Sequence, residues 1–340
     1  MAKQMLKENN QGITLVALVV TIVVLLILAG ITIMYTMGEN SIFKKAQEAK
    51  NKTEEAIKNE QEYMNSIDNM INEYTNGTST PTPEVPENPW AKIERIAKAI
   101  ANDSNITSDS TQATGTTEKG ESYDIKVGDI LEVEYNGEAK RVRVLGFKHD
   151  DLVDQTVYGG THEKASISFE LLDFMTGENY MQMNANETNE GGWANTEIRT
   201  FLEGSSGRGK LSNNSYIKQV KKKFIATYND ANSVTTCNDY LWLLAASEVV
   251  NAGYNGGNTR GWAITKEGEQ YKYYQGVTEE WNSSSEGRQK RPTSSDSAAF
   301  WWLRSPYGDD GNSYCRINDG GNSGVTRTNV RHGVAPGFCI

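Results

Sequence analysis

The most strongly apolar stretch of the chain runs from Gly12 to Met37 and contains no charged residue. A helix rises about 1.5 Å per residue, and the hydrocarbon core of a bilayer is about 30 Å thick. This stretch is therefore long enough to cross a membrane once. Lys3 and Lys7 precede it, which favours a cytoplasmic N-terminus with the rest of the chain outside the cell.

Beyond this stretch, from Glu39 to Tyr74, apolar residues recur at helical spacing and charged residues occupy the other face. Glu54 and Lys58 are placed for an i,i+4 pair. The pattern predicts that the membrane helix continues outward as an amphipathic helix. The two helical parts together would span residues 13–75. A simple stalk or a coiled coil would have the same pattern.

Residues 76–122 change character and are predicted to form a linker. Four of the seven prolines fall between Thr80 and Pro89, which favours a stiff, extended spacer. A short helix is expected from Trp90 to Ala101. Residues 102–121 are rich in Ser, Thr and Asn and are expected to be a loose second linker.

A folded domain is predicted over residues 123–340. Ile130 to Tyr135 and Arg141 to Phe147 alternate like strands and are joined across Asn136-Gly137, a strong hairpin signal. Ser166 to Phe174 is predicted as a further strand, and Asn195 as the N-cap of a helix. Later segments add short strands and a helical turn: Tyr216–Tyr228 with Lys221, Lys222 and Lys223 in solvent, Leu241–Leu244, Ala246–Val250, Phe300–Arg304, Tyr314–Ile317 and Val334–Ile340. This mixture predicts an α+β fold.

Composition narrows the classes of partner. The formal net charge is -10 and the basic residues are scattered, which argues against nucleic acid. The three cysteines, Cys237, Cys315 and Cys339, are too few for a disulfide scaffold. Cys315 and Cys339 could pair in an exported domain, or all three could be buried thiols.

The N-terminal residues resemble a known processing site. The leader ends Asn10-Gln11-Gly12 and continues Ile13-Thr14-Leu15, which is similar to type IV prepilins. The resemblance implies that residues 1–12 are a leader, that a membrane peptidase cuts after Gly12, and that Ile13 is then methylated. The family usually has Glu at the fifth mature position, where this chain has Ala17. A minor or tip subunit is therefore expected, with an uncleaved membrane anchor as the alternative.

The C-terminal motifs resemble an uncharacterised family of bacterial surface domains. They are Phe300-Trp301-Trp302-Leu303-Arg304-Ser305-Pro306 and Gly333-Val334-Ala335-Pro336-Gly337-Phe338-Cys339-Ile340, with Gly191-Gly192-Trp193, Arg199 and Leu241-Trp242-Leu243-Leu244. The resemblance implies a C-type-lectin-like domain, the fold of formylglycine-generating enzymes and of variable proteins diversified by retroelements. From their size, Trp301, Trp302 and Phe338 are expected in the core, and Arg304 is expected to pair with an acid or a carbonyl.

Between the two motifs lies a segment with the residue types of an adaptable binding surface. It contains no Lys, Glu, Gln, Met or Trp, the gap that adenine-directed diversification of Asn codons would leave. The predicted ligand-binding residues are Tyr307, Asp309, Asp310, Asn312, Ser313, Tyr314, Arg316, Asn318, Asn322, Arg327, Asn329 and His332.

Catalytic motifs are not found. His149, His162 and His332 lack metal-ligand spacing, and neither a Gly-x-Ser-x-Gly motif nor a phosphate loop occurs. Asp309, Asp310 and Asn312 could hold calcium, but a solvated acidic loop is the preferred interpretation. No cofactor or metal is expected.

Together these features predict a pilin-like adhesin at the cell membrane and outer surface. Its partners would be the membrane, pilus or pseudopilus subunits, and a protein or glycan ligand on another cell or a phage. One alternative is a membrane-tethered oxidase related to formylglycine-generating enzymes, using Cys315 and Cys339. The other is a structural pseudopilin that only packs against pilus components.

Overall fold

The structure is a computed structural model that describes residue 50 and residues 87–226, 230, 233–250, 266–277, 285–308 and 310–340. The chain divides into two compact units, Met1–Pro86 and Glu87–Ile340. The predicted leader, the membrane and amphipathic helix, and the first part of the linker lie outside the described residues, apart from Lys50. In the described part, no helix has the length and apolar character needed to cross a membrane.

The largest sheet of the second unit has the strand order β14-β6-β4-β3 and is antiparallel throughout. Its strands are β3 (Ile130–Tyr135), β4 (Glu138–Phe147), β6 (Ile167–Leu171) and β14 (Gly337–Cys339). The predicted hairpin is confirmed, because Tyr135 pairs with Glu138 across the turn. Asn136 and Gly137 both have positive φ, 53° and 83°, as a type I′ turn requires.

Helix α3 (Pro89–Asn102) belongs to this unit and packs against its core. The Trp90 ring contacts Phe169 of β6 and Phe338 of β14 edge-on, with centroid distances of 5.5 and 5.7 Å. Strands β1 (Gln112–Thr116) and β2 (Ser122–Lys126) then form a hairpin beside it. The short helix predicted from Trp90 to Ala101 is therefore confirmed. The residues around it are not a linker, because the folded unit starts at Glu87 and not at Tyr123.

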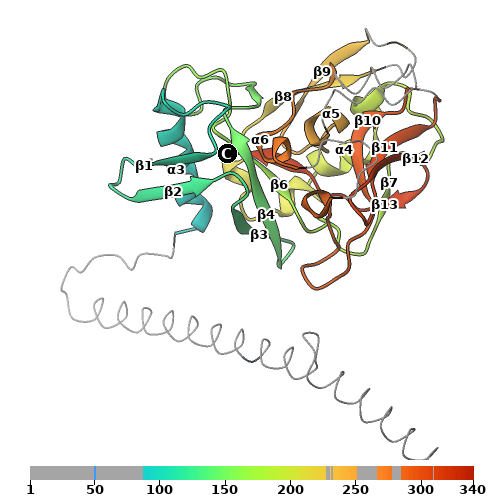
Figure 1. Cartoon of the computed structure of the whole chain (residues 1–340), viewed down its shortest axis with the longest axis horizontal. Helices are drawn as coiled ribbons and strands as arrows, with labels where there is room; N and C mark the ends of the chain where they lie inside the picture. Colours follow the sequence, from blue (N-terminus) through green and yellow to red (C-terminus); the bar gives the residue numbers. More distant parts are fainter. Residues whose placement is uncertain are drawn as a thin grey trace, which may run out of the picture. The chain divides into compact units, whose positions relative to one another are not determined.

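Three further sheets complete the unit. The first has the order β5-β8-β9, with β5 (Asp151–Leu152), β8 (Val220–Ile225) and β9 (Val234–Asp239). The second has the order β10-β11-β12, with β10 (Trp301–Pro306), β11 (Ser313–Ile317) and β12 (Ser323–Arg327). The third pairs β7 (Met181–Gln182) with β13 (Arg331–His332). Within this unit β10–β12 lie at the opposite end from α3, β1 and β2 (Figure 1).

The remaining described helices are short. They are η1 (Gly192–Asn195), α4 (Glu197–Glu203), η2 (Arg208–Lys210), η3 (Asn214–Tyr216), α5 (Ala246–Val249), α6 (Lys272–Gln275) and η5 (Glu286–Arg288). The described unit is thus mostly strands with few helices. The α+β assignment, and with it the C-type-lectin-like domain expected over residues 123–340, is wrong. It is replaced by a mainly-β unit joined by loops and single helical turns.

Two local predictions also change. Thr196, not Asn195, is the N-cap of α4, because its hydroxyl accepts from the Arg199 N–H at 3.1 Å. Lys222 is not solvated: it lies on β8 between exposed Lys221 and Lys223, and only 2% of it is exposed. Strand alternation turns the middle lysine of the run inward.

Candidate functional site

The predicted ligand-binding residues lie on β11, on β12 and on the loops around them, except for His332, which lies on β13. Most are half-buried, and Arg327, at the end of β12, is exposed. The half-buried residues are Tyr307, Asp310, Asn312, Arg316, Asn318, Asn322 and Asn329. Asp309 lies outside the described residues. The strands β11 and β12, which carry or flank most of these residues, lie with β10 at one end of the unit (Figure 1).

Three of the predicted residues lie in the interior, so the prediction that they form part of the binding surface is wrong for them. Tyr314 is fully buried, and Ser313 and His332 are nearly so. Tyr314 and Ser313 begin β11, where the loop enters the core, and His332 on β13 packs against the Phe300 and Trp302 rings. Tyr314 therefore stabilises the surface from beneath and does not contact a ligand.

The loop from residue 307 to 313 is fixed by Asn189, which is not among the predicted ligand-binding residues. Asn189 is fully buried, and its side-chain Nδ2 donates to the carbonyls of Asp310 and Ser313, each at 2.9 Å. Its backbone N–H donates to the Gly311 carbonyl at 2.7 Å. One amide side chain thus holds the loop from inside, and no local spacing in the sequence marks such a long-range contact.

The neighbouring loops are held in the same way. The Thr328 N–H donates to the Asn312 carbonyl at 2.9 Å, and the Asn322 N–H donates to the side chain of Asn318 at 2.8 Å. Because the backbone is fixed by these bonds, the polar side chains project from a preorganised surface. Binding to such a surface costs less conformational entropy than binding to a loose loop.

A network of buried charges lies behind β10. The Lys222 ammonium contacts Asp150 at 2.6 Å and Glu248 at 2.7 Å. The Arg304 guanidinium makes a bidentate contact with the same Glu248, at 2.5 and 2.8 Å. Arg304 thus has the acid partner predicted for it, and Trp301, Trp302 and Phe338 are fully buried as predicted. The network ties β8, α5 and β10 together.

Glu267 borders this network and is held by neutral donors. Its carboxylate accepts from the Ile225 N–H at 2.8 Å and from the Ser305 hydroxyl. Burial raises the pKa of Glu267 to about 7, against the lowering effect of Arg304. Burial also acts to raise the pKa of Glu248, but Arg304 and Lys222 outweigh it and hold that pKa below its usual value. The two acids therefore differ in charge near neutral pH.

A small polar pocket of about 140 Å³ opens over the network and is lined by His149, Asp150, Lys222, Glu248 and Glu267 among others. Perturbed acids in a pocket are a common mark of an active site. Here the acids and bases satisfy one another, with Tyr271 donating to Asp150 at 3.0 Å. Structural ion networks perturb pKa values in the same way, and this is the interpretation we adopt.

The three cysteines are free thiols. Cys315 and Cys339 are buried, and Cys237 is half-buried. Burial raises the pKa of all three, that of Cys237 to about 12. A raised pKa disfavours the thiolate, which is the nucleophilic and metal-binding form. In the part of the chain that the structure describes, no group of three or more His, Cys, Asp or Glu could hold a metal ion.

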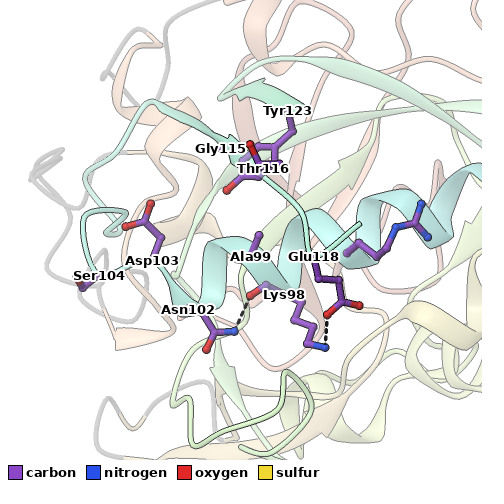
Figure 2. A pocket seen from close by; sticks show the side chains of 10 residues that line it. Lys98, Ala99, Asn102, Asp103, Ser104, Gly115, Thr116, Glu118 and Tyr123 are labelled. Atoms are coloured by element: carbon purple, nitrogen blue, oxygen red, sulfur yellow. Dashed lines mark hydrogen bonds and ion pairs between the residues drawn. The ribbon is translucent and has the colours of Figure 1, made fainter. Parts of the chain in front are cut away.

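A separate cleft of about 470 Å³ lies between α3 and the β1–β2 hairpin (Figure 2). An ion pair at its rim joins Lys98 and Glu118 at 2.7 Å, and Asn102 donates to the Lys98 carbonyl. Both charged side chains are exposed, so the pair is worth little. The cleft contains none of the predicted ligand residues.

Residues 167–340 match a protein family described as a domain of unknown function (DUF6273). The match covers just over half of the chain, and the chain therefore belongs to this family. It begins at the first residue of β6 and includes β8, α5 and β10–β14. The surface around β11 and β12 and most of the buried network thus lie inside the family domain. Comparison with curated proteins and with solved structures finds no match.

The Lys222→Met substitution tests the buried network. It removes the cation between Asp150 and Glu248 and is expected to lower the free energy of unfolding by about 3 kcal/mol or more. All seven tryptophans follow residue 87, so tryptophan fluorescence during urea unfolding reports this unit. Lys221→Met and Lys223→Met are matched controls, expected within about 0.5 kcal/mol of the parent. Equal losses for all three would contradict the network.

Glu267 predicts a pH dependence of stability. An unperturbed glutamate titrates near 4.5, whereas the folded chain holds the proton to about pH 7. The folded state thus binds the extra proton between these values, and stability falls as pH rises through this window, by about 3 kcal/mol. His332, whose pKa burial lowers to about 4, gives a slope of opposite sign.

The Glu267→Gln variant separates the two slopes, because glutamine does not titrate and His332 is unchanged. The difference in unfolding free energy between parent and variant should shift by about 3 kcal/mol from pH 4.5 to pH 7.5 in favour of the variant. A difference that stays constant across this range would refute the assignment.

Proposed function

We propose that this chain is a membrane-anchored cell-surface protein whose second unit binds a ligand through the side chains around β11 and β12. The observation that carries the proposal is the combination of polar, partly exposed side chains with a backbone held by buried hydrogen bonds. Binding residues are often placed on loops that a rigid scaffold positions. Tyr, Asn, Ser and Arg supply adaptable contacts there.

The sequence supports the location. The uncharged segment from Gly12 to Met37 follows a short basic leader and resembles a prepilin processing site. In this proposal the segment attaches the protein to the membrane or to a pilus-like assembly, and the second unit meets a protein or glycan on another cell or a phage. The missing residue types between positions 307 and 332 are consistent with diversification of this surface.

Binding is preferred to catalysis because the candidate catalytic thiols are unsuited to the task. The alternative oxidase would use Cys315 and Cys339. Both thiols are buried and have raised pKa values. The second alternative, a purely structural subunit, would not capture a ligand, and the binding test below distinguishes it from the proposed role.

The binding test uses the full-length protein in detergent on an array of immobilised glycans and mucins. We expect capture by at least one probe, and at least a tenfold loss of capture when Tyr307, Asn312 and Asn329 are changed together to Ala. Tyr314 is left intact because truncating a fully buried tyrosine would unfold the domain.

The control variant changes the same residue types in and beside the cleft of Figure 2. Changing Tyr123 and Asn102, which line the cleft, and Asn105, which donates to the lining residue Asp103, to Ala should leave capture unchanged. Loss of capture by the control variant alone would move the site to that cleft. Absence of capture by every probe, or equal capture by both variants and the parent, would count against the proposal.

Processing gives an independent prediction for the anchor. Mass spectrometry of the protein isolated from cell envelopes should find an N-terminal methylated Ile13. Gly12→Val should abolish its appearance, because Gly12 is the residue at which the prepilin resemblance places the cut. An intact Met1 in the mature protein would remove the pilin-like part of the proposal and leave a plain membrane anchor.

A further inference from the structure

Arg316 occupies the central strand of the three-stranded sheet. The strand register places it opposite Trp302 of β10 on one side and Gly324 of β12 on the other. Its guanidinium carbon lies 4.5 Å from the centroid of the Phe300 ring. The side chain is therefore fixed by an aromatic contact from the residue that precedes β10 and by close packing against β12.

Gly324 shows how the guanidinium is oriented. A Cβ built on this glycine would lie 3.3 Å from Cζ of Arg316 and 3.4 Å from both terminal nitrogens. Nearly equal distances to the three atoms mean that the plane of the guanidinium faces the Gly324 backbone. The absence of a side chain at position 324 allows this close approach.

Among the described residues, Arg316 has no ion-pair partner. The buried arginines Arg143 and Arg304 each contact a glutamate, Glu170 and Glu248 respectively. Arg316 has only the distant favourable effect of Asp319, and burial lowers its pKa. Its Nη1 is buried and lacks a hydrogen-bond partner. A buried donor without a partner costs about 1–3 kcal/mol.

Two further polar atoms, one on β13 and one in the turn between β11 and β12, also lack partners in the described structure. They are Nε2 of His332 and Oδ1 of Asn322. The His332 ring lies 5.4 Å from the Phe300 ring, and burial together with Arg316 lowers its pKa to about 4. His332 is therefore neutral at pH 7. Asn322 precedes β12, in the turn that joins β12 to β11.

We propose that Arg316 binds the carboxylate of an acidic ligand. This inference rests on the proposed function and specifies the chemistry of the ligand. A planar guanidinium matches a carboxylate through two parallel hydrogen bonds. The segment between residues 307 and 332 contains no lysine, and one half-buried cation with a neutral histidine suits a monoanion better than a phosphate dianion.

The test measures saturation-transfer difference NMR signals of small probes in the presence of the full-length protein in detergent. Sodium glucuronate should give a signal, and glucose at the same concentration should not. Sodium acetate tests the carboxylate alone and should also give a signal; no signal with acetate would count against the carboxylate contact. Methyl sulfate tests a different monoanion, and stronger binding of methyl sulfate than of glucuronate would overturn the carboxylate assignment.

Arg316→Gln should reduce the affinity for glucuronate at least tenfold, because a charge-assisted pair is replaced by a neutral one. Arg331→Gln is the matched control: Arg331 is exposed on strand β13 and should have no effect. Glucuronate affinity unchanged by Arg316→Gln, or reduced equally by Arg331→Gln, would refute the proposal.

The Gly324→Ala variant retains Arg316 but displaces its guanidinium. It therefore tests the Arg316 site even if the Arg316→Gln variant does not fold. We expect a several-fold loss of glucuronate affinity with the fold retained, since the φ of Gly324 is not in the left-handed region. Unchanged affinity would count against the site. The glycan-array result depends on Tyr307, Asn312 and Asn329, so either proposal can fail while the other stands.

Discussion

The buried contact between Glu248 and its two cations, Lys222 and Arg304, is the constraint on which this end of the fold depends. Charges taken out of water are costly unless they are paired and hydrogen-bonded. Glu248 meets both cations at 2.5–2.8 Å, so none of the three is left alone. Because the residues come from β8, α5 and β10, the strands can pair with their neighbours only when these elements are correctly positioned. A hydrophobic contact would tolerate sliding; this one does not.

The same network gives the opposite side of the sheet a fixed support. β10 is held by Arg304 behind it and is fully buried along its length. β11 and β12 add to its edge, and their loops are held by Asn189 and Thr328. Rigidity at the back and polar side chains at the front are the combination that a recognition surface needs. The guanidinium of Arg316 differs from those of Arg143 and Arg304 in lacking a carboxylate partner among the described residues.

The sequence predicts short-range features of this fold well. Asn136-Gly137 encodes its hairpin through two residues that tolerate positive φ, and the apolar segments at the C-terminal end become buried strands. It fails where a local pattern is ambiguous. The run of three lysines at positions 221–223 suggests solvent, and only the partner acids, 26 and 72 residues away in sequence, explain why Lys222 is inside.

The candidate site shows the same division. Residue types between positions 307 and 332 predict a polar surface, and the structure places most of them around one hairpin. The sequence could not reveal that Tyr314 points into the core or that Asn189 fixes the loop, because both depend on contacts between distant segments. The linker prediction fails for a similar reason: the pattern predicts helix α3, but its packing into the folded unit depends on β6 and β14.

Trp90 has a mechanical consequence. It stands at the beginning of the folded unit, its ring lies against Phe169 and Phe338, and its indole N–H donates to the Glu132 carbonyl at 3.2 Å. Any tension carried by the chain upstream of Glu87 would enter the folded unit at this ring. It would spread from there into the sheet β14-β6-β4-β3. A load applied at β11 and β12 would then be resisted by side-chain packing across the whole unit, including the C-terminal strand β14, whose Phe338 contacts the Trp90 ring.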